Sequence, residues 1–318
     1  MTPMTHDPST SPKHLDLFTG IGSFSLGARW SGYNTIAHSE IEPFCNQLLT
    51  ARFPHIPNLG DVRKLCRQSC ECLTAAEMPE HFDPKTVGLD FDDDEPGCFC
   101  PLCSEEHCYP VDYGDCDCIS AQNFTEDHGF PDIITSGSPC QDFSFCGKGK
   151  GIEGERSGLI LEIPRIADVL GVPFCILENV PGILARGFDD WCAAMEAIGH
   201  TVATVCVQAA AFGLSHGRER VFAVTHHQGV GVEGLWSEGL QEPRPLDRSL
   251  LSVRHRDGQW KAEPDVRRSP NGIPAGLDRP VLTNPRLKAL GNSLPPQIAA
   301  CLMDFIRYYA TKHQPQFQ

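Results

Sequence analysis

Apolar residues occur along this chain in two kinds of block, and the two kinds alternate. Short uninterrupted apolar runs are typical of buried strands, whereas stretches with apolar residues three and four positions apart are typical of helices that cover a core. From residue 14 onward the short runs and the periodic stretches follow one another. This order predicts a doubly wound α/β fold, in which helices cover a mainly parallel sheet.

The blocks can be assigned to residue ranges, and the pattern is interrupted twice. It breaks off after residue 62 and resumes at residue 133, and it is weak between residues 225 and 286. The predicted strands are 15–18, 33–38, 132–137, 174–177, 201–207 and 220–224, and the predicted helices are 23–30, 42–52, 159–170 and one that follows 295–296. The predicted domains are a flexible tail (1–13), a core domain (14–62, 131–225 and 286–318), an insert (63–130) and a small second lobe (226–285).

The overall composition is that of an ordinary soluble protein, with 41% apolar and 21% charged residues. The sequence shows no secretory signal and no apolar run long enough to span a membrane. We therefore expect a cytoplasmic, monomeric protein that makes no membrane contact. In a reducing compartment the 16 cysteines favour metal binding or catalysis over disulfides.

The insert differs from the rest of the chain in charge and in cysteine content. It carries 16 acidic and 4 basic residues and so accounts for most of the net charge of −15. A short acidic segment with few apolar residues cannot bury enough core to fold alone, and metal binding would supply the missing free energy. We predict that the insert binds structural Zn²⁺; a thiol-rich acidic loop without metal is the alternative. The candidate ligands are Cys66, Cys70, Cys72, Cys98, Cys100, Cys103, Cys108, Cys116 and Cys118.

One cysteine outside the insert lies at a position suited to catalysis. Cys140 follows the apolar run 132–137 within the sequence Ser138-Pro139-Cys140-Gln141. The end of such a strand lies at the carboxyl edge of the sheet, where ligands of open α/β folds bind. A thiolate at this edge can act as a nucleophile. A cysteine that merely lines the core is the alternative.

A glycine-rich turn follows the first predicted strand. Phe18, Gly20 and Gly22 stand between that strand and the predicted helix 23–30. Glycines let a ligand approach the backbone closely, and the N-terminus of a helix is electropositive. Glu40 ends the second strand, where nucleotide-binding α/β folds carry an acid that binds a ribose. An ordinary turn and a solvated carboxylate are the alternatives.

Three further groups of residues place charged side chains at positions suited to ligand binding. Glu178 follows the buried run 174–177, and burial at such a position raises the pKa of a carboxyl group. Arg218 and Arg220 lie two residues apart and therefore on one face of a strand, where paired guanidinium groups can hold a carbonyl and a phosphate. The segment 141–158 combines glycines with Lys and Arg, which suits a mobile basic loop. Solvated charges and an inert loop are the alternatives.

Taken in order, these motifs resemble those of the DNA cytosine-5 methyltransferases, most of all the compact enzymes of phages and prophages. The resemblance covers 14–62, 131–225 and 286–312. It implies a Rossmann-like methyltransferase sheet, S-adenosylmethionine as the methyl donor and double-stranded DNA as the partner. The matching motifs are Phe18-x-Gly20-x-Gly22, Glu40, Asp61, Pro139-Cys140-Gln141, Glu178-Asn179-Val180, Arg218-x-Arg220 and Gly291-Asn292-Ser293.

The resemblance also implies a role for each matching residue. Cys140 would attack carbon 6 of a cytosine flipped out of the duplex, and Glu178 would protonate ring nitrogen 3. Arg218 and Arg220 would position the base. The residues implied to bind the donor are Phe18, Gly20, Gly22, Glu40, Ile41, Asp61, Val62, Pro139 and Asn292. The residues implied to contact the substrate are Gln141, Ser144, Asn179 and Val180.

The chain departs from the family pattern in two places. The lobe at 226–285 is short where the family carries a sizeable target-recognition domain. The acidic insert is an addition that suits contact with a protein partner, or support of the catalytic domain, better than contact with DNA. Two alternative functions therefore stay open. One is a transfer RNA cytosine-5 methyltransferase, which shares these motifs and can have a reduced recognition segment. The other is a non-catalytic regulator that acts through the insert.

Overall fold

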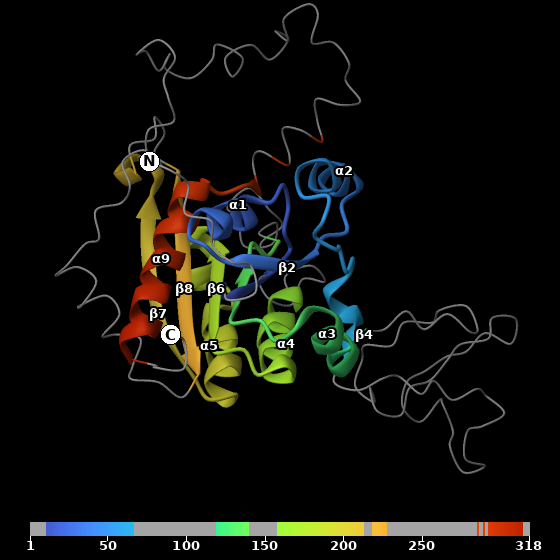
Figure 1. The fold of residues 1–318 in the computed structure, drawn as a ribbon. Coiled ribbons are helices and arrows are strands. Elements are labelled where there is room, and N and C mark those ends of the chain that lie inside the picture. Colours follow the sequence, from blue (N-terminus) through green and yellow to red (C-terminus); the bar gives the residue numbers. More distant parts are fainter. Residues whose placement is uncertain are drawn as a thin grey trace, which may run out of the picture.

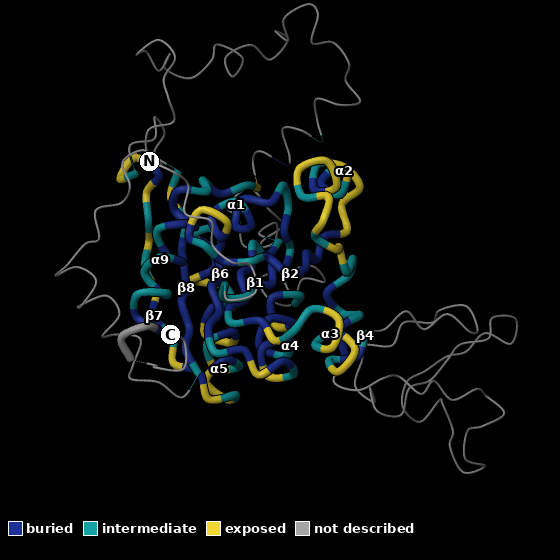
Figure 2. Tube along the Cα trace, in the orientation of Figure 1, coloured by how far each residue is buried: buried dark blue, intermediate teal, exposed yellow. Residues whose placement is uncertain are grey.

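A six-stranded sheet forms the centre of the molecule (Figure 1). The structure is a computed structural model that describes residues 11–66, 119–139, 158–212, 218–227, 285, 289 and 292–313. Figure 2 shows that the strands are the most deeply buried part of this chain and that the exposed residues lie mainly on the surrounding helices and loops. Within the described ranges the strand order is β2 (Asn34–Ser39), β1 (Lys13–Leu17), β5 (Ile133–Ser136), β6 (Phe174–Asn179), β8 (Glu219–His227) and β7 (His200–Gln208).

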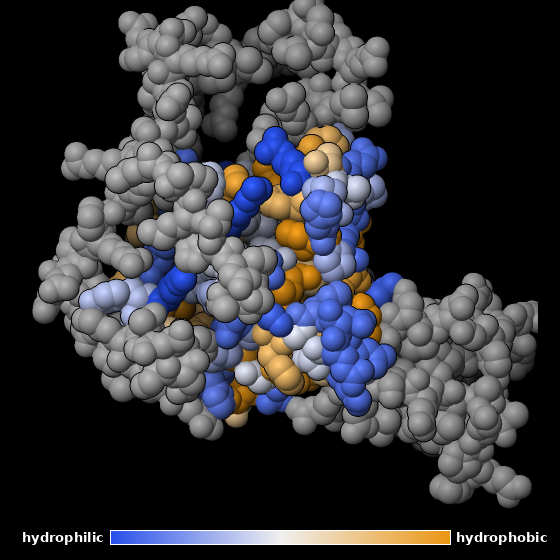
Figure 3. All heavy atoms as spheres, in the orientation of Figure 1, coloured by the Kyte–Doolittle hydropathy of each residue, from blue (hydrophilic) through white to orange (hydrophobic). Residues whose placement is uncertain are grey.

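Helices cover both faces of this sheet. One face carries α1 (Ser23–Trp30) and α9 (Pro296–His313), and the other carries α3 (Ala121–His128), α4 (Glu162–Leu170) and α5 (Phe188–Ala197). The remaining helices are α2 (Pro43–Arg52) and the short 3₁₀ helices η1 (Val62–Lys64), η5 (Gly158–Leu161), η6 (Pro181–Ala185) and η7 (Ala209–Phe212). On the face in Figure 3, apolar surface lies between the more polar surfaces over α2 and α3. No helix in the described part of the chain has the length and apolar character needed to cross a bilayer.

The strand order changes direction in the middle of the sheet. β1, β2, β5 and β6 run parallel, and β8 runs antiparallel to both β6 and β7. From β1 the chain moves outward to β2, whereas from β5 it moves outward to β6 on the opposite side. The switch point therefore lies between β1 and β5. In open α/β folds ligands bind at the carboxyl ends of the strands at such a point.

The residues of β6 alternate between two apolar cores. Phe174 and Ile176 contribute to the core under α1 and α9, and Cys175 and Leu177 contribute to the core under α3, α4 and α5. By the same alternation Glu178 faces the α1 and α9 side of the sheet. Burial on both faces explains why this strand reads as a continuous apolar run in the sequence.

Close packing fixes α9 against α1. A β-carbon at Gly27 would lie 2.6 Å from the Ala299 β-carbon and 3.0 Å from the carbonyl oxygen of Pro296. Ser31 Oγ donates to the carbonyl oxygen of Ala300 at 2.9 Å. The absence of a side chain at Gly27 thus lets the two helices approach, and this contact places the residues that precede α9 at the carboxyl edge of the sheet.

The structure confirms the predicted fold class and most of the predicted elements. β1 begins at Lys13, the last residue that we assigned to the tail, and β6 continues through Asn179 instead of ending at residue 177. β8 extends to His227, beyond the predicted end at residue 224 and into the segment assigned to the second lobe. β6 and β8 are longer than predicted because they pair with each other: Asn179 faces Val221, and Phe174 faces His226.

The prediction that regular structure stops between residues 62 and 133 is wrong. η1, β3 (Leu65–Cys66), β4 (Ile119–Ser120) and α3 lie in this interval, and β3 pairs with β4 in parallel. The helix α3 has one buried residue, Phe124, so it shows almost no apolar periodicity. Its start depends on a cap, because Ser120 Oγ accepts a hydrogen bond from the backbone N–H of Asn123 at 3.0 Å. Residues 67–118 of the insert and 228–284 of the lobe lie outside the described residues.

Candidate active site

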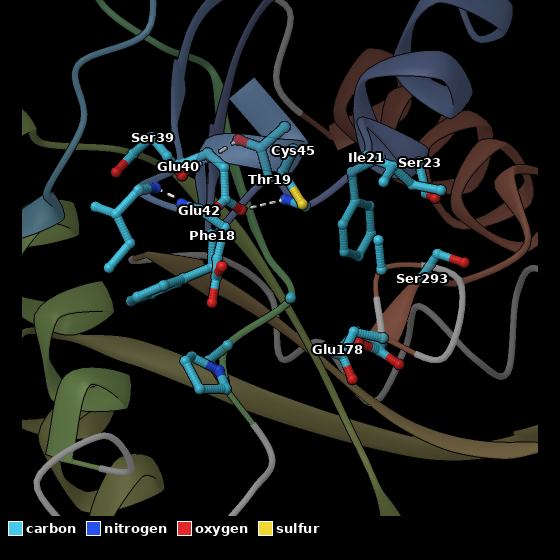
Figure 4. A pocket seen from close by; sticks show the side chains of 18 of the residues that line it. Phe18, Thr19, Ile21, Ser23, Ser39, Glu40, Glu42, Cys45, Glu178 and Ser293 are labelled. Atoms are coloured by element: carbon cyan, nitrogen blue, oxygen red, sulfur yellow. Dashed lines mark hydrogen bonds between the residues drawn. The ribbon is translucent and has the colours of Figure 1, made fainter. Parts of the chain in front are cut away.

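A cavity of about 620 Å³ opens at the carboxyl ends of β1, β2, β5 and β6. This volume is within the range of pockets that hold cofactors and small ligands. In Figure 4, Ser39 and Glu40 lie at one end of the cavity, and Glu178 and Ser293 lie at the other. The predicted site residues that line it are Phe18, Gly20, Glu40, Ile41, Asp61, Val62, Pro139, Glu178, Asn179, Val180, Arg220 and Asn292.

The glycine-rich turn after β1 forms one wall of the cavity. Phe18 and Gly20 have positive φ angles of 51° and 57°, and a residue with a β-carbon rarely adopts this conformation. Thr19 holds the turn in place: its Oγ1 donates to the carbonyl oxygen of Asp16 at 2.7 Å, and its backbone N–H donates to that of Ser39 at 3.1 Å. The turn is therefore tied to both β1 and β2.

Glu40 joins the two loops that border its end of the cavity. Its Oε2 accepts a hydrogen bond from the backbone N–H of Gly20 at 2.7 Å, and its Oε1 accepts from those of Ile41 and Glu42 at 2.9 and 2.7 Å. A carboxylate offers about four acceptor positions, so these three contacts leave room for a ligand hydroxyl. Ile41 beside it lines the cavity while 62% of its surface is exposed, which leaves an apolar surface for a ligand.

Asp61 forms an ion pair with Arg63, a residue that the sequence did not single out. Arg63 Nε lies 2.9 and 3.1 Å from the two carboxylate oxygens of Asp61, and its Nη2 lies 2.5 Å from Oδ2. Burial raises the pKa of Asp61, but the hydrogen bonds and charge of Arg63 more than reverse this, so the pKa lies below its usual value. Asp61 is thus held as a carboxylate on the cavity wall.

Glu178 is a buried carboxyl group at the opposite end of the cavity. Burial raises its pKa, and the charges of Arg220 and Arg218 oppose this rise. Arg220 Nε lies 2.9 Å from Glu178 Oε1, which the antiparallel pairing of β6 with β8 makes possible, since Glu178 faces Phe222 in the register. Arg218 precedes the first residue of β8 and does not line the cavity.

Asn179 connects the end of β6 to the segment that leads to the predicted nucleophile. Its Nδ2 donates to Ser138 Oγ at 3.0 Å, and its Oδ1 accepts from the backbone N–H of Val180 at 2.8 Å. This buried side chain therefore braces the backbone just before Pro139, which itself lines the cavity. The predicted residues Cys140, Gln141 and Ser144 lie outside the described residues.

The segment before α9 closes the cavity from the C-terminal side. Asn292, Ser293 and Leu294 line it. Gly22, which the resemblance assigned to the donor, does not line the cavity: it precedes α1 with a φ of 83°, and a β-carbon there would lie 2.6 Å from the ring of Phe53. A side chain at position 22 would therefore displace the ring of Phe53.

A buried polar network that the sequence did not reveal lies below the glycine-rich turn. Asp16 Oδ2 accepts hydrogen bonds from Ser25 Oγ at 2.6 Å and from the Ser25 backbone N–H at 3.1 Å, and Oδ1 accepts from Thr135 Oγ1 at 3.1 Å. His38 Nε2 lies 2.9 Å from Ser25 Oγ, and His14 Nε2 lies 2.7 Å from Thr135 Oγ1. The one signal in the sequence was a pair of polar residues inside an apolar strand.

Burial dominates the proton affinities in this network. It raises the pKa of Asp16 to about 7, although the hydrogen bonds from Ser25 and Thr135 oppose it. It also lowers the pKa of His14 to about 3 and that of His38 to about 4. Both histidines are therefore neutral near pH 7, and the network holds α1 to β1, β2 and β5 through hydrogen bonds without an ion pair.

The described residues bear on the zinc prediction at one position. Cys66, the predicted ligand that lies within the described ranges, is buried in β3. Those ranges contain no group of three or more His, Cys, Asp or Glu side chains that is arranged to hold a metal ion. The other eight cysteines lie outside them, so the zinc site stays a prediction.

The chain is similar in sequence to known DNA methyltransferases. Residues 13–83 and 102–262 match the sequence model of the family described as C-5 cytosine-specific DNA methylase. Among curated proteins, the chain is 24% identical over 246 residues to the type II methyltransferase M.NgoBI of Neisseria gonorrhoeae, which covers 76% of this chain and 58% of the relative. It is 26% identical over 223 residues to M.MspI of Moraxella sp., covering 68% and 39%.

A solved structure with a similar chain is the S. pombe Dnmt2 methyltransferase, with a TM-score of 0.44 and 14% identity over 79% of this chain and 57% of that one. The chain spans about half the length of the curated relatives that it matches. The match to the family model extends over well over half of the chain and includes the strands that border the cavity. The chain therefore belongs to the C-5 cytosine-specific DNA methylase family.

Proposed function

We propose that the protein transfers a methyl group from S-adenosylmethionine to carbon 5 of cytosine in double-stranded DNA. Membership of the family supports this chemistry. The observation that carries the proposal is a single cavity lined at one end by Glu40 and Asp61 and at the other by Glu178 and Arg220. A donor and a base that occupy the two ends would lie next to each other.

The donor end suits an adenosyl group. Ile41 and Phe18 offer apolar surfaces to a purine ring, Glu40 has an acceptor position for a ribose hydroxyl, and Asp61 is a carboxylate that accepts a hydrogen bond from an amino group. Val62, Pro139 and Asn292 complete this wall. When bound, S-adenosylmethionine supplies the methyl group as an electrophile.

The base end suits activation of a cytosine. Carbon 5 is a weak nucleophile, so the Cys140 thiolate first bonds to carbon 6, and the displaced electron pair moves through the ring to nitrogen 3. Glu178 donates its proton to nitrogen 3 and neutralises that charge. After carbon 5 has taken the methyl group, the ring is restored by loss of the carbon 5 proton to a base, departure of the thiolate and return of the nitrogen 3 proton to Glu178.

The neighbours of Glu178 support these steps. Arg220 holds the Glu178 carboxyl group and lines the cavity, where its guanidinium can donate to the carbonyl oxygen of the base. Asn179 braces Ser138 and thereby the segment that leads to Cys140. Because a paired base cannot reach such a cavity, the target cytosine has to be flipped out of the duplex or already unpaired.

Transfer of tritiated methyl groups to duplex DNA, followed by bisulfite sequencing, tests the proposal. We expect the wild type to methylate cytosine in DNA and Cys140→Ala to be inactive. Cys206→Ala, which removes an exposed thiol on β7, serves as the control. Turnover by Cys140→Ala would show that Cys140 is not the nucleophile. Methylation of transfer RNA but not of DNA would favour the transfer RNA methyltransferase. Binding of S-adenosylmethionine without turnover on either substrate would favour a non-catalytic regulator.

The insert and the second lobe carry separate proposals. We propose that the lobe at 226–285 selects the target sequence and that the cysteines of the insert bind structural Zn²⁺, with the acidic surface available to a protein partner. Metal analysis of the purified protein after chelator treatment tests the zinc proposal, and a protein free of zinc would exclude it. The cytoplasmic location and the monomeric state stay predictions.

A further inference from the structure

Within the described structure, Arg63 contacts both oxygens of the Asp61 carboxylate. Oδ1 accepts from Arg63 Nε at 2.9 Å and from the Arg63 backbone N–H at 3.0 Å, and Oδ2 lies 3.1 Å from Nε and 2.5 Å from Nη2. Three N–H groups of Arg63 make these contacts, because Nε carries one hydrogen that both oxygens share, and they occupy most of the about four acceptor positions of a carboxylate. A ligand amino group therefore has to share the carboxylate with Arg63 or displace it.

The backbone that follows Asp61 is anchored, so a ligand that displaces Arg63 from Asp61 has to turn the Arg63 side chain rather than move η1. Arg165 on α4 donates from Nη1 to the carbonyl oxygen of Leu65 at 2.6 Å and from Nη2 to that of Val62 at 3.3 Å. Glu162 in turn holds Arg165, with Oε2 2.6 Å from Nη2. Rotation of the Arg63 side chain opens Asp61, whereas movement of η1 would break these bonds.

We infer that Arg63 competes with the adenine amino group of the donor for the Asp61 carboxylate, and thereby sets donor affinity and selectivity for an amino over an oxo group. The inference rests on the proposed function, because it takes the adenosyl group to bind at Asp61. Arg63 also lines the cavity, so its guanidinium lies within reach of the same edge of the purine. A purine with an oxygen in place of the amino group would accept from Arg63 and be repelled by Asp61.

The expected size of the competition is modest. The side chains of Arg63 and Asp61 are 29% and 23% exposed, so water and salt screen their attraction. Ion pairs with partial exposure contribute little to stability, and opening one changes an affinity by about two- to fivefold. Salt weakens such a pair further, so the competition should fade as the ionic strength rises.

Calorimetric titration of the full-length protein with S-adenosylhomocysteine and with S-inosylhomocysteine tests the inference. The variants are Arg63→Met, which removes the donors and the charge, and Arg63→Lys, which keeps the charge without the paired contacts. Arg52→Met, which removes a positive charge at the exposed end of α2, is the matched control. Thermal melting of each variant reports whether it is folded.

We expect Arg63→Met to bind S-adenosylhomocysteine about two- to fivefold more tightly than the wild type, with a gain that shrinks at high salt. Its affinity for the inosyl compound should stay the same or fall, and Arg63→Lys should lie between the two. Weaker adenosyl binding by folded Arg63→Met, or an equal shift for both compounds, would overturn the inference. Failure of the wild type to bind the adenosyl compound would instead refute the donor site, and the inference with it.

Discussion

Two buried carboxyl groups on the same face of the sheet, Asp16 and Glu178, have opposite surroundings. Asp16 accepts hydrogen bonds from neutral donors of Ser25 and Thr135, whereas Glu178 lies beside the guanidinium group of Arg220. Burial raises the pKa of both groups. At Asp16 hydrogen bonds oppose the rise, and at Glu178 the charges of arginines oppose it.

The difference shows how one face of the sheet holds both a rigid support and a carboxyl group whose protonation responds to its neighbours. A buried network of satisfied neutral hydrogen bonds fixes the positions of its members, and here it ties α1 to β1, β2 and β5. Burial raises the pKa of a carboxyl group, and cationic neighbours lower it. Where the two effects oppose each other, small changes nearby alter the pKa. Such a group suits proton transfer to a base that enters and leaves.

The largest effect is expected from Glu178→Gln, which tests the reactive side of this comparison. Gln cannot deliver a proton to ring nitrogen 3, and loss of general acid catalysis lowers turnover by about 10²- to 10⁴-fold. The affinity for S-adenosylhomocysteine should change little. Steady-state methyl transfer and calorimetry measure the two quantities, with the exposed neighbour substitution Glu219→Gln as control. Near-normal turnover by Glu178→Gln would show that Glu178 is not the general acid.

The supporting side is tested by Asp16→Ala, which leaves the donors of Ser25 and Thr135 without their acceptor. Buried donors that lose a partner destabilise a fold by about 1–3 kcal/mol each, so we expect the free energy of unfolding to fall by about 2–3 kcal/mol. Asp16→Asn keeps one acceptor oxygen and should lose less. Urea denaturation measures both. Equal stability of Asp16→Ala and the wild type would contradict a supporting role.

The same carboxyl group predicts a pH dependence of stability. Because the folded pKa of Asp16 is about 7 and its usual value is 3.8, the unfolded chain releases this proton first as the pH rises. The stability of the wild type relative to Asp16→Asn should therefore fall between about pH 4 and pH 7 and stay constant above. Comparing the two proteins at each pH cancels the contributions of the buried histidines. A flat difference would show that Asp16 is ionised in the folded state at all these values.

The smallest effect is expected from Gly27→Ala, which tests whether the packing of α9 against α1 affects ligand binding in the cavity. The added methyl group would lie 2.6 Å from the Ala299 β-carbon, and overpacking of this kind destabilises by about 1–2 kcal/mol. The segment with Asn292 should shift and weaken binding of S-adenosylhomocysteine. Gly171→Ala, where a β-carbon meets no atom within 4 Å but the φ is positive, is the control for loss of stability without a clash at α9. An unchanged affinity for S-adenosylhomocysteine would show that the position of α9 does not influence the site.

Local patterns were sufficient for much of the fold and the site. The short apolar runs predicted the strands of the main sheet, and the positions of Glu40 and Glu178 after two of those runs predicted that both would lie at the carboxyl edge of the sheet. These inferences succeed because periodicity, turn chemistry and strand ends are properties of neighbouring residues. The helix α3 was missed because a single apolar residue, Phe124, carries its packing.

The sequence by itself determined most of the elements of the main sheet and which polar side chains lie at their ends. Only the tertiary structure decided which of these side chains meet. His14 and Thr135 are 121 positions apart, and Asn179 and Ser138 are 41 apart, so no local pattern relates them. Even the pairing of Asp61 with nearby Arg63 depends on the anchoring of η1 by α4. Contacts between distant strands follow from how the sheet assembles, and a linear pattern of apolar and polar residues does not encode that order.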